Sequence, residues 1–182
     1  MIEVLILLVV LLVVVVWIYN LLIKDRNQVL AAWSDIDVQL KRRHDLIPQL
    51  VTAVKAYSEH EKATMLAVTE LRSKSEIAEH LPEKARIENE IQAAVSRLAL
   101  VAEAYPDLKA DENFRQLSEN LGEVEEHIQY ARRYYNGSVR IFNTRIQSFP
   151  QILIATSFNF QAAEYFEVED QTQRDSPTVE LD

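Results

Sequence analysis

The chain contains no cysteine and only two glycines and five prolines among its 182 residues. The absence of cysteine excludes a disulfide framework and a thiolate zinc site. The shortage of glycine disfavours an all-β sandwich and a glycine-rich phosphate-binding loop, because tight turns and close backbone approach depend on that residue. A chain of this length fits a single domain with attached segments.

Acidic charge is concentrated at the C-terminal end of the chain. The formal net charge is −9, of which residues 164–182 carry −6 and residues 1–163 only −3. The body of the chain is therefore nearly balanced, and no basic face favours nucleic acid as a partner. Residues 168–182 are acidic and polar, cannot bury enough apolar surface to fold, and are predicted to form a disordered tail.

An uncharged, strongly apolar run begins the chain and covers residues 4–23. As a helix it would span about 30 Å, which matches the hydrocarbon core of a bilayer. Trp17 and Tyr19 stand toward its end and Lys24 and Arg26 follow it, an order typical of a membrane–water interface. We predict that residues 1–23 form a transmembrane anchor and that residues 4–23 contact the lipid bilayer.

A signal peptide is the alternative interpretation of this run. Such a peptide has a basic start, a shorter apolar stretch and a cleavage site of small residues. This chain starts with Met-Ile-Glu and shows no such site, which favours an uncleaved anchor. Lys24, Arg26 and the basic run 41–43 follow the anchor, so the positive-inside tendency places the C-terminal domain in the cytoplasm, with the opposite side as the alternative.

The body of the chain shows helical periodicity and no sustained alternation of period two. Apolar residues recur at steps of three and four around residues 33–54, in a pattern that continues past Ser58 to about Glu79, and again around residues 87–101 and 117–146. Prolines at 48, 82, 106 and 150 interrupt or bound them, and Pro48 predicts a kink near residues 45–47. We predict an all-α fold in which an N-terminal transmembrane helix is followed, over residues 24–167, by an antiparallel bundle of three to four long helices. Residues 151–166 should pack on it as a short helix or an irregular segment.

Residues that carry chemistry are scattered rather than clustered. The four histidines, at 44, 60, 80 and 127, share no metal-ligand spacing, and no nucleophile motif occurs. The stretch from His44 to Pro48 is similar to the phosphoacceptor box of sensor histidine kinases, but its proline comes one residue too early and no ATP-binding domain follows. His44 also lies on the predicted core stripe. We therefore expect no catalytic residue, metal, cofactor or small-molecule substrate.

Four sequence blocks resemble the signature of the bacterial LemA family, and with the anchor they extend the similarity over residues 1–167. One departure is Asn159, where the family usually has glycine. The blocks are NQVLAAWSDIDVQLKRRHDLIP (27–48), YPDLKA (105–110), ARRYYN (131–136) and FNTRIQSFP (142–150).

The resemblance implies a small bacterial membrane protein, single-pass in the cytoplasmic membrane, with a bundle of long helices and no established catalytic activity. Family members are often encoded beside membrane metalloproteases or other small membrane proteins. We therefore expect a scaffold, adaptor or regulator that acts through protein–protein contacts with copies of itself or with other membrane proteins. The alternatives are an accessory or substrate-presenting subunit of a membrane protease or hydrolase, and an enzyme with an unrecognised site.

The blocks are more polar than a helical core requires. The hypothesis that follows is a buried or interfacial polar network that fixes the register of the helices, since polar core groups sometimes have this role. Ordinary pairing at the surface is the alternative. The predicted members are Asp37, Arg42, Asp45, Arg132 and Asn143.

Overall fold

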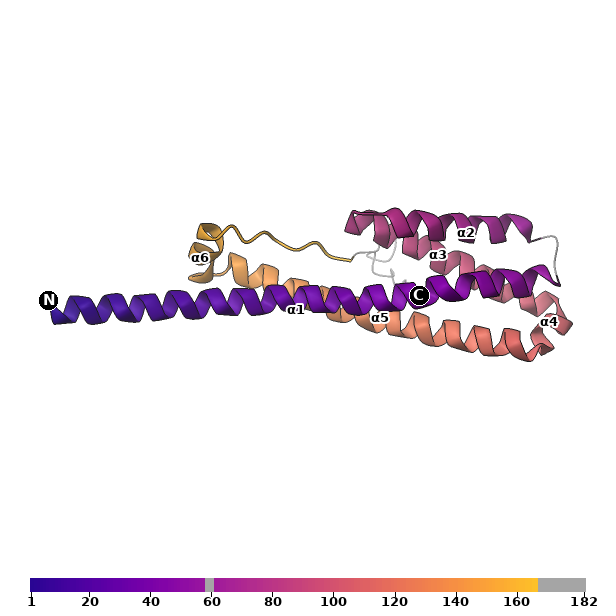
Figure 1. Ribbon diagram of the computed structural model, residues 1–182, viewed down its shortest axis with the longest axis horizontal. Helices are drawn as coiled ribbons and strands as arrows, with labels where there is room; N and C mark the ends of the chain where they lie inside the picture. Colours follow the sequence, from indigo (N-terminus) through magenta and orange to yellow (C-terminus); the bar gives the residue numbers. More distant parts are fainter. Residues whose placement is uncertain (58–60, 167–182) are drawn as a thin grey trace, which may run out of the picture.

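The computed structural model describes residues 1–57 and 61–166, apart from the side chain of Ala102, and every regular element in this part of the chain is helical. The predicted all-α fold with an apolar N-terminal helix is confirmed (Figure 1). The predicted acidic tail 168–182 lies outside the described residues. The elements are α1 (Ile2–Lys55), α2 (Lys62–Ile77), α3 (Leu81–Val101), the 3-10 helix η1 (Ala102–Ala104), α4 (Pro106–Ala110), α5 (Glu112–Gln147) and α6 (Gln151–Ser157).

The first helix, α1, is a continuous rod of 54 residues, about 80 Å long. It passes without a break from the uncharged run into the bundle and continues through Pro48 to Lys55. By length and composition it is the one helix among the described residues that is long and apolar enough to cross a membrane. Its N-terminal end, before the first buried residue Ile18, projects beyond the rest of the molecule (Figure 1).

The long helices alternate in direction, and α1 and α5 lie side by side along most of the bundle (Figure 1). The helical pair α2 and α3 packs on the C-terminal part of α1, away from the apolar end. Two core clusters result. One cluster lies mainly between α1 and α5 and includes Ile18 and Ile146. The other lies among α1, α2, α3 and α5 and includes Ile47 and Leu121.

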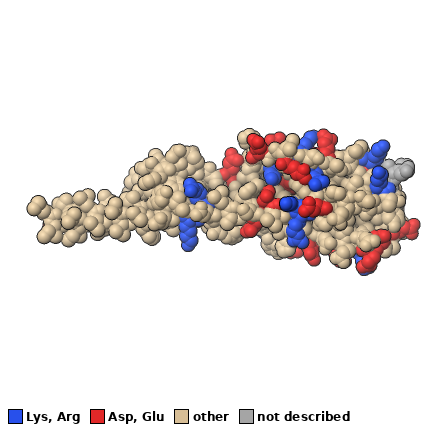
Figure 2. Space-filling model, in the orientation of Figure 1, with Lys and Arg blue, Asp and Glu red and all other residues tan. Residues whose placement is uncertain are grey.

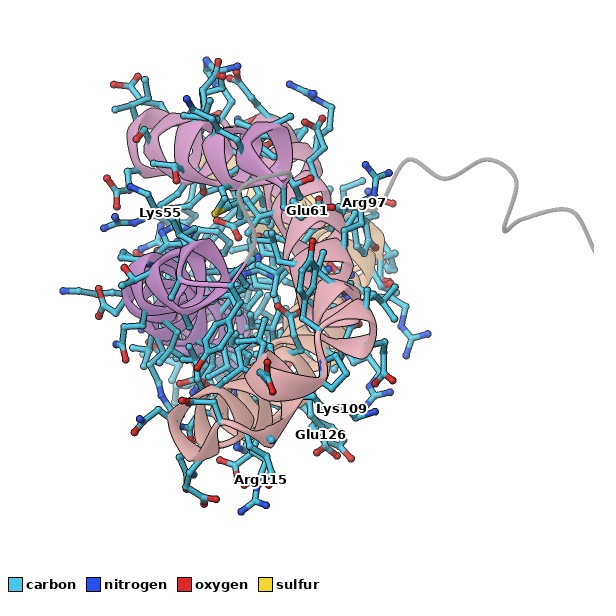
Figure 3. The ribbon with its side chains drawn as sticks, turned by 90° about the vertical axis from the view of Figure 1, so that its right-hand side faces the viewer. Lys55, Glu61, Arg97, Lys109, Arg115 and Glu126 are labelled. Carbon is cyan, nitrogen blue, oxygen red and sulfur yellow. The ribbon has the colours of Figure 1, made fainter. Side chains whose placement is uncertain are left out.

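The distal end of the bundle, opposite the apolar run, presents charge to solvent. The view in Figure 3 shows an apolar interior between the helices and charged side chains that point outward around the rim. Such a surface suits water rather than lipid. The labelled residues are Lys55, Glu61, Arg97, Lys109, Arg115 and Glu126.

The longest bundle helix after α1 starts where the sequence predicts, near Asp111. The backbone N–H of Phe114 donates to Oδ1 of Asp111 at 2.9 Å, which satisfies one of the free donors of the first turn of α5. The buried residues of α5 then follow at helical spacing, from Phe114 through Ile128 to Ile146. They form the face that packs on α1.

The segment predicted as a short helix or a packed stretch contains both. The helix α6 ends in a Schellman motif: the N–H of Phe160 donates to the carbonyl of Ala155 at 2.9 Å, and the N–H of Asn159 to that of Thr156 at 3.2 Å. Asn159 has a φ of 54°, in the left-handed region that glycine or asparagine tolerates best. The departure from the family glycine therefore keeps a turn that glycine would also allow.

After this turn, residues 160–166 run back along α5 as an extended strap (Figure 1). Asn143 and Asn136 hold the strap, and each makes two hydrogen bonds to the backbone of a different strap residue. The side chain of Asn143 pairs with the N–H and carbonyl of Ala163, both at 2.8 Å, and Asn136 pairs with those of Phe166 at 2.9 and 3.0 Å. The two asparagines are seven residues apart on the helix, a rise of about 10 Å, and this equals the length of the three extended residues that separate Ala163 from Phe166.

Candidate functional site

A buried polar cluster lies where the long helices meet, and Glu88 of α3 is at its centre. The side chain of Glu88 is fully buried. Its carboxylate forms an ion pair with Arg43 of α1, accepts a hydrogen bond from the hydroxyl of Ser75 of α2, and lies 2.9 Å from Nε2 of His44. Three helices thus converge on one carboxylate.

Arg43 extends the cluster to a fourth helix. Its guanidinium is fully buried and donates through Nη1 to Oε1 of Glu125 of α5 at 2.7 Å. Through Nη2 it also donates to the backbone carbonyl of Glu88 at 3.1 Å. Because one side chain contacts both α3 and α5, it fixes the position of α1 relative to both helices.

The sequence contained a signal for this cluster. Arg43 stands three residues after Leu40 and four before Ile47, and Glu88 three residues before Ile91, so both charges occupy core positions of otherwise apolar stripes. His44 was predicted to face inward, and it is buried. A charged residue at a core position of a helical stripe is predicted to be buried, but the spacing within that helix does not show which residue of another helix is its partner.

The pKa of Glu88 reflects two opposed effects. Burial by itself raises the pKa, but the hydrogen bond from His44, the charge of Arg43 and the hydroxyl of Ser75 outweigh it and lower the pKa from 4.5 to about 2. The carboxylate is therefore ionised throughout the physiological pH range. Its pKa is too far from neutral pH for Glu88 to suit general acid–base catalysis.

Glu88 makes the stability of the bundle sensitive to acid. Because its pKa is lower in the folded than in the unfolded chain, the stabilisation is complete above about pH 4.5 and is lost as the pH falls toward 2. Thermal unfolding of the full chain in detergent micelles, followed by circular dichroism, should show this loss. The Glu88→Gln variant, which cannot titrate, should lose less between pH 5 and pH 2; an equal loss would contradict the assignment.

Arg132 lies near the cluster but is poorly satisfied. Its side chain is buried, donates through Nη1 to Oδ1 of Asn89 at 2.9 Å, and stacks over the ring of Phe166 at 4.7 Å. Nε and Nη2 have no hydrogen-bond partner among the described protein atoms. Burial, together with the charge of Arg43, lowers the pKa of Arg132 to about 10.

We expect Arg132→Met to leave the melting temperature unchanged or to raise it. The flexible methionine side chain is shorter but can pack toward Phe166, and the change removes a guanidinium whose burial is only partly compensated. Differential scanning calorimetry of the full chain in micelles measures this. A fall of more than about 5 °C, roughly 2 kcal/mol for a chain of this size, would show that the single bond to Asn89 is worth more than the geometry indicates.

The structure does not bring together the five residues predicted to form a network. Asp37 is exposed and accepts from Lys84 at 3.3 Å, Arg42 is exposed and donates to Gln39 at 3.3 Å, and Asp45 is exposed. Arg132 contacts Asn89, and Asn143 binds the strap. The cause is the helical periodicity of α1, which turns residues 37, 42 and 45 toward solvent and Arg43 into the core.

The four residues predicted at the membrane interface lie at the level where α6 meets α1. Trp17 is exposed, and Tyr19 is half-buried with its ring centroid 4.8 Å from that of Phe158. Lys24 and Arg26 are exposed, and the guanidinium of Arg26 lies 5.7 Å from the centre of the Phe160 ring. On the face drawn in Figure 2, blue side chains border the uncharged end of the molecule.

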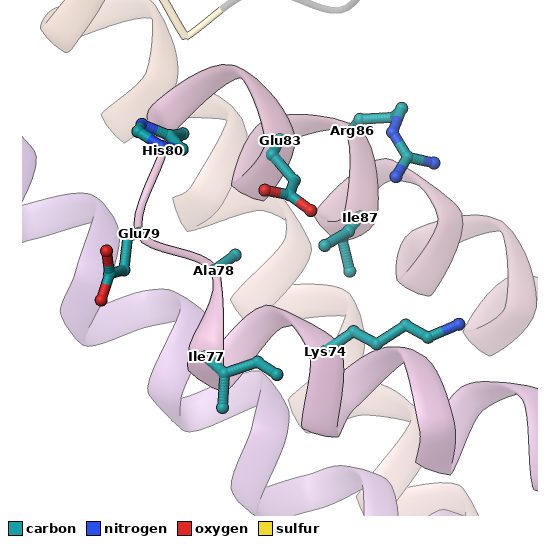
Figure 4. A pocket seen from close by; sticks show the side chains of 8 residues that line it. All are labelled: Lys74, Ile77, Ala78, Glu79, His80, Glu83, Arg86 and Ile87. Atoms are coloured by element: carbon teal, nitrogen blue, oxygen red, sulfur yellow. The ribbon is translucent and has the colours of Figure 1, made fainter.

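Glu88 and Arg43, at the centre of the polar cluster, are fully buried, and a surface hollow lies away from them. A hollow of about 510 Å³ lies at the turn between α2 and α3, and its charged rim includes Lys74, Glu79, Glu83 and Arg86 (Figure 4). These side chains are exposed, so the hollow is shallow rather than enclosed. The described residues contain no group of three or more His, Asp or Glu side chains that could hold a metal ion.

Comparison with known protein sequences shows the family of the chain. A sequence model of the LemA family matches residues 32–181. Protein LemA of Metamycoplasma hominis is 28% identical over 163 residues, which cover 89% of this chain and 74% of that protein. Magnetosome protein MamQ 2 of Paramagnetospirillum magneticum is 31% identical over 74 residues, 41% of this chain and 27% of its own length. Magnetosome protein MamQ of Magnetospirillum gryphiswaldense is 27% identical over 73 residues, 40% of this chain and 27% of its own length. The chain therefore belongs to the LemA family.

Proposed function

We propose that this protein is a non-catalytic, membrane-anchored scaffold or adaptor that acts through protein–protein contacts, including contacts with copies of itself. The observation that carries the proposal is the continuity of α1, a single helix that joins the apolar run to the centre of the bundle. Its part beyond residue 23 extends for about 48 Å. A rod of this kind holds its side faces at a fixed distance and direction from the bilayer.

The buried cluster supports a structural rather than a catalytic role. The ion pair of Glu88 and Arg43 is closed off from solvent, so these ionised side chains are not accessible to a substrate. An interior that joins α1, α2, α3 and α5 by charged hydrogen bonds favours one defined arrangement of helices. A defined and stiff surface suits an adaptor, because a surface that is already ordered loses less conformational entropy on binding.

A contact face is available on α5. Tyr130, Tyr134 and Ile141 are each more than half exposed and lie along one side of the helix. Exposed tyrosines bury large area at little conformational cost and are enriched at protein interfaces. Attachment to a membrane raises the effective concentration of neighbouring copies, so weak contacts at this face suffice.

Cross-linking in the membrane tests this face. The photoreactive amino acid para-benzoylphenylalanine replaces Tyr134 in one full-length variant and Gln129 in a control, since Gln129 is exposed on the same helix but points to a different side. Irradiated cells should give discrete protein adducts, either dimers of this chain or a defined second protein, from position 134 and not from position 129. Equal or absent adducts at both positions would contradict the proposed face.

We propose a bacterial cytoplasmic membrane as the location, with the bundle in the cytoplasm. The exposed Lys24 and Arg26 directly after the uncharged run support this orientation. A C-terminal tag should resist protease in intact cells and in spheroplasts and should be digested only after lysis. Digestion in intact spheroplasts would reverse the orientation and make envelope proteins the candidate partners.

A further inference from the structure

We propose that residues 149–158, the turn before α6 and α6 itself, enter the lipid bilayer beside the anchor, so that the membrane contacts a second segment of the chain. This inference rests on the proposed function in one respect, namely that α1 crosses a membrane. The partner is the lipid surface: the headgroup region and the adjoining ends of the acyl chains.

The length of the free anchor carries the argument. Ile18 is the first buried residue of α1, and fourteen uncharged residues separate it from Glu3. Fourteen helical residues span about 21 Å, whereas a bilayer core of about 30 Å needs about twenty. The missing length is supplied by residues 18–23, which are also uncharged. The part of α1 that completes the span is therefore the part that carries α6.

Packing ties α6 to this stretch of α1. Ile18 and Leu22 are buried in the same core cluster as Ala155 of α6, with Ile154 and Phe160 packed against it. The ring of Tyr19 contacts the rings of Phe158 and Phe160, with centroid distances of 4.8 and 6.0 Å. Figure 1 shows α6 beside α1 on the anchor side of the bundle. If residues 18–23 lie in lipid, α6 lies at the same depth.

The surface of this segment suits lipid better than water. No charged residue occurs from position 146 to position 163. Phe149 is 80% exposed, Leu153 59% and Phe158 56%, a concentration of large apolar side chains that is costly in water. The exposed polar side chains nearby, such as Thr156 and Ser157, are neutral, as expected for the boundary between headgroups and acyl chains.

Basic residues mark where the lipid would end. Lys24 and Arg26 are exposed on α1 directly after the uncharged run. On the opposing helix the last charged residue before α6 is Arg145, which forms an ion pair with Asp25. Cations at this level are suited to phosphate headgroups. The ring of Phe158, directly after α6, lies beside Tyr19 and so on the apolar side of these cations.

Single-cysteine variants test the depth directly, because the natural chain has no cysteine. Full-length protein carrying Leu153→Cys, Val9→Cys or Ile77→Cys is labelled with the fluorophore NBD and reconstituted in vesicles of phosphatidylcholine and phosphatidylglycerol. All three positions are exposed on the protein surface, so labelling should not disturb the core. Quenching is measured with aqueous iodide and with a lipid that carries a nitroxide near its headgroup.

We expect the label at position 153 to be quenched by the nitroxide lipid and to be several-fold less sensitive to iodide than the label at position 77. Strong iodide quenching at 153 with a protected label at 9 would overturn the inference and leave the anchor intact. A label at 153 that neither quencher reaches would place α6 in a protein contact, which also overturns it. Iodide quenching at position 9 would instead contradict the proposed anchor.

Discussion

Replacing Glu88 by alanine is expected to lower the melting temperature by about 10 °C or more. The change leaves the guanidinium of Arg43 buried without its main counter-charge and removes the acceptor of Ser75. Removing one partner of a buried ion pair typically costs about 3–5 kcal/mol, and each kcal/mol shifts the melting temperature of a chain of this size by about 2–4 °C. Thermal unfolding of the full chain in micelles measures the effect.

Glu90 provides the matched control on the same helix. It forms an ion pair with Arg86 at the surface, where both side chains are exposed, and such pairs are worth under about 1 kcal/mol. Glu90→Ala should therefore change the melting temperature by only a few degrees at most. If the two variants unfold at the same temperature, the buried cluster does not hold the helices together.

Replacing Asn136 and Asn143 together by alanine is expected to release the strap from α5. The double change removes four hydrogen bonds to the backbone of Ala163 and Phe166. At about 0.5–1.5 kcal/mol for each bond, the loss is about 2–6 kcal/mol, or roughly 10 °C in melting temperature. Amide hydrogen exchange at residues 160–166 should rise in the variant before the rest of the chain unfolds.

The exposed Asn113 on the same helix is the control for this pair. Asn113→Ala should leave exchange in the strap unchanged. Each single variant should have an intermediate effect, because each asparagine holds a different residue of the strap. Unchanged exchange in the double variant would mean that aromatic packing, such as that of Trp33 on Phe166, is sufficient to hold the segment.

The sequence by itself determined the elements of this protein. Apolar residues at steps of three and four identified the long helices, and Asp111 marked the start of α5, because an aspartate side chain there accepts a hydrogen bond from a free N–H group of the first turn. The uncharged run of residues 4–23 defined the apolar part of α1, since no other segment has comparable length and composition. Each of these properties depends on residues close together in the sequence, so the sequence pattern alone predicts it.

Only the tertiary structure decided which polar residues meet. Asp37, Arg42 and Asp45 stand within a few positions of Arg43, yet they face solvent while Arg43 reaches Glu88 and Glu125. A rotation of about 100° per residue separates these outcomes, and the partners are 45 and 82 positions away. Likewise, the contact of α6 with residues 18–22 depends on α5 carrying the chain back along α1. Spacing within one helix holds no information on which distant helix lies opposite, so these contacts became visible only in the folded chain.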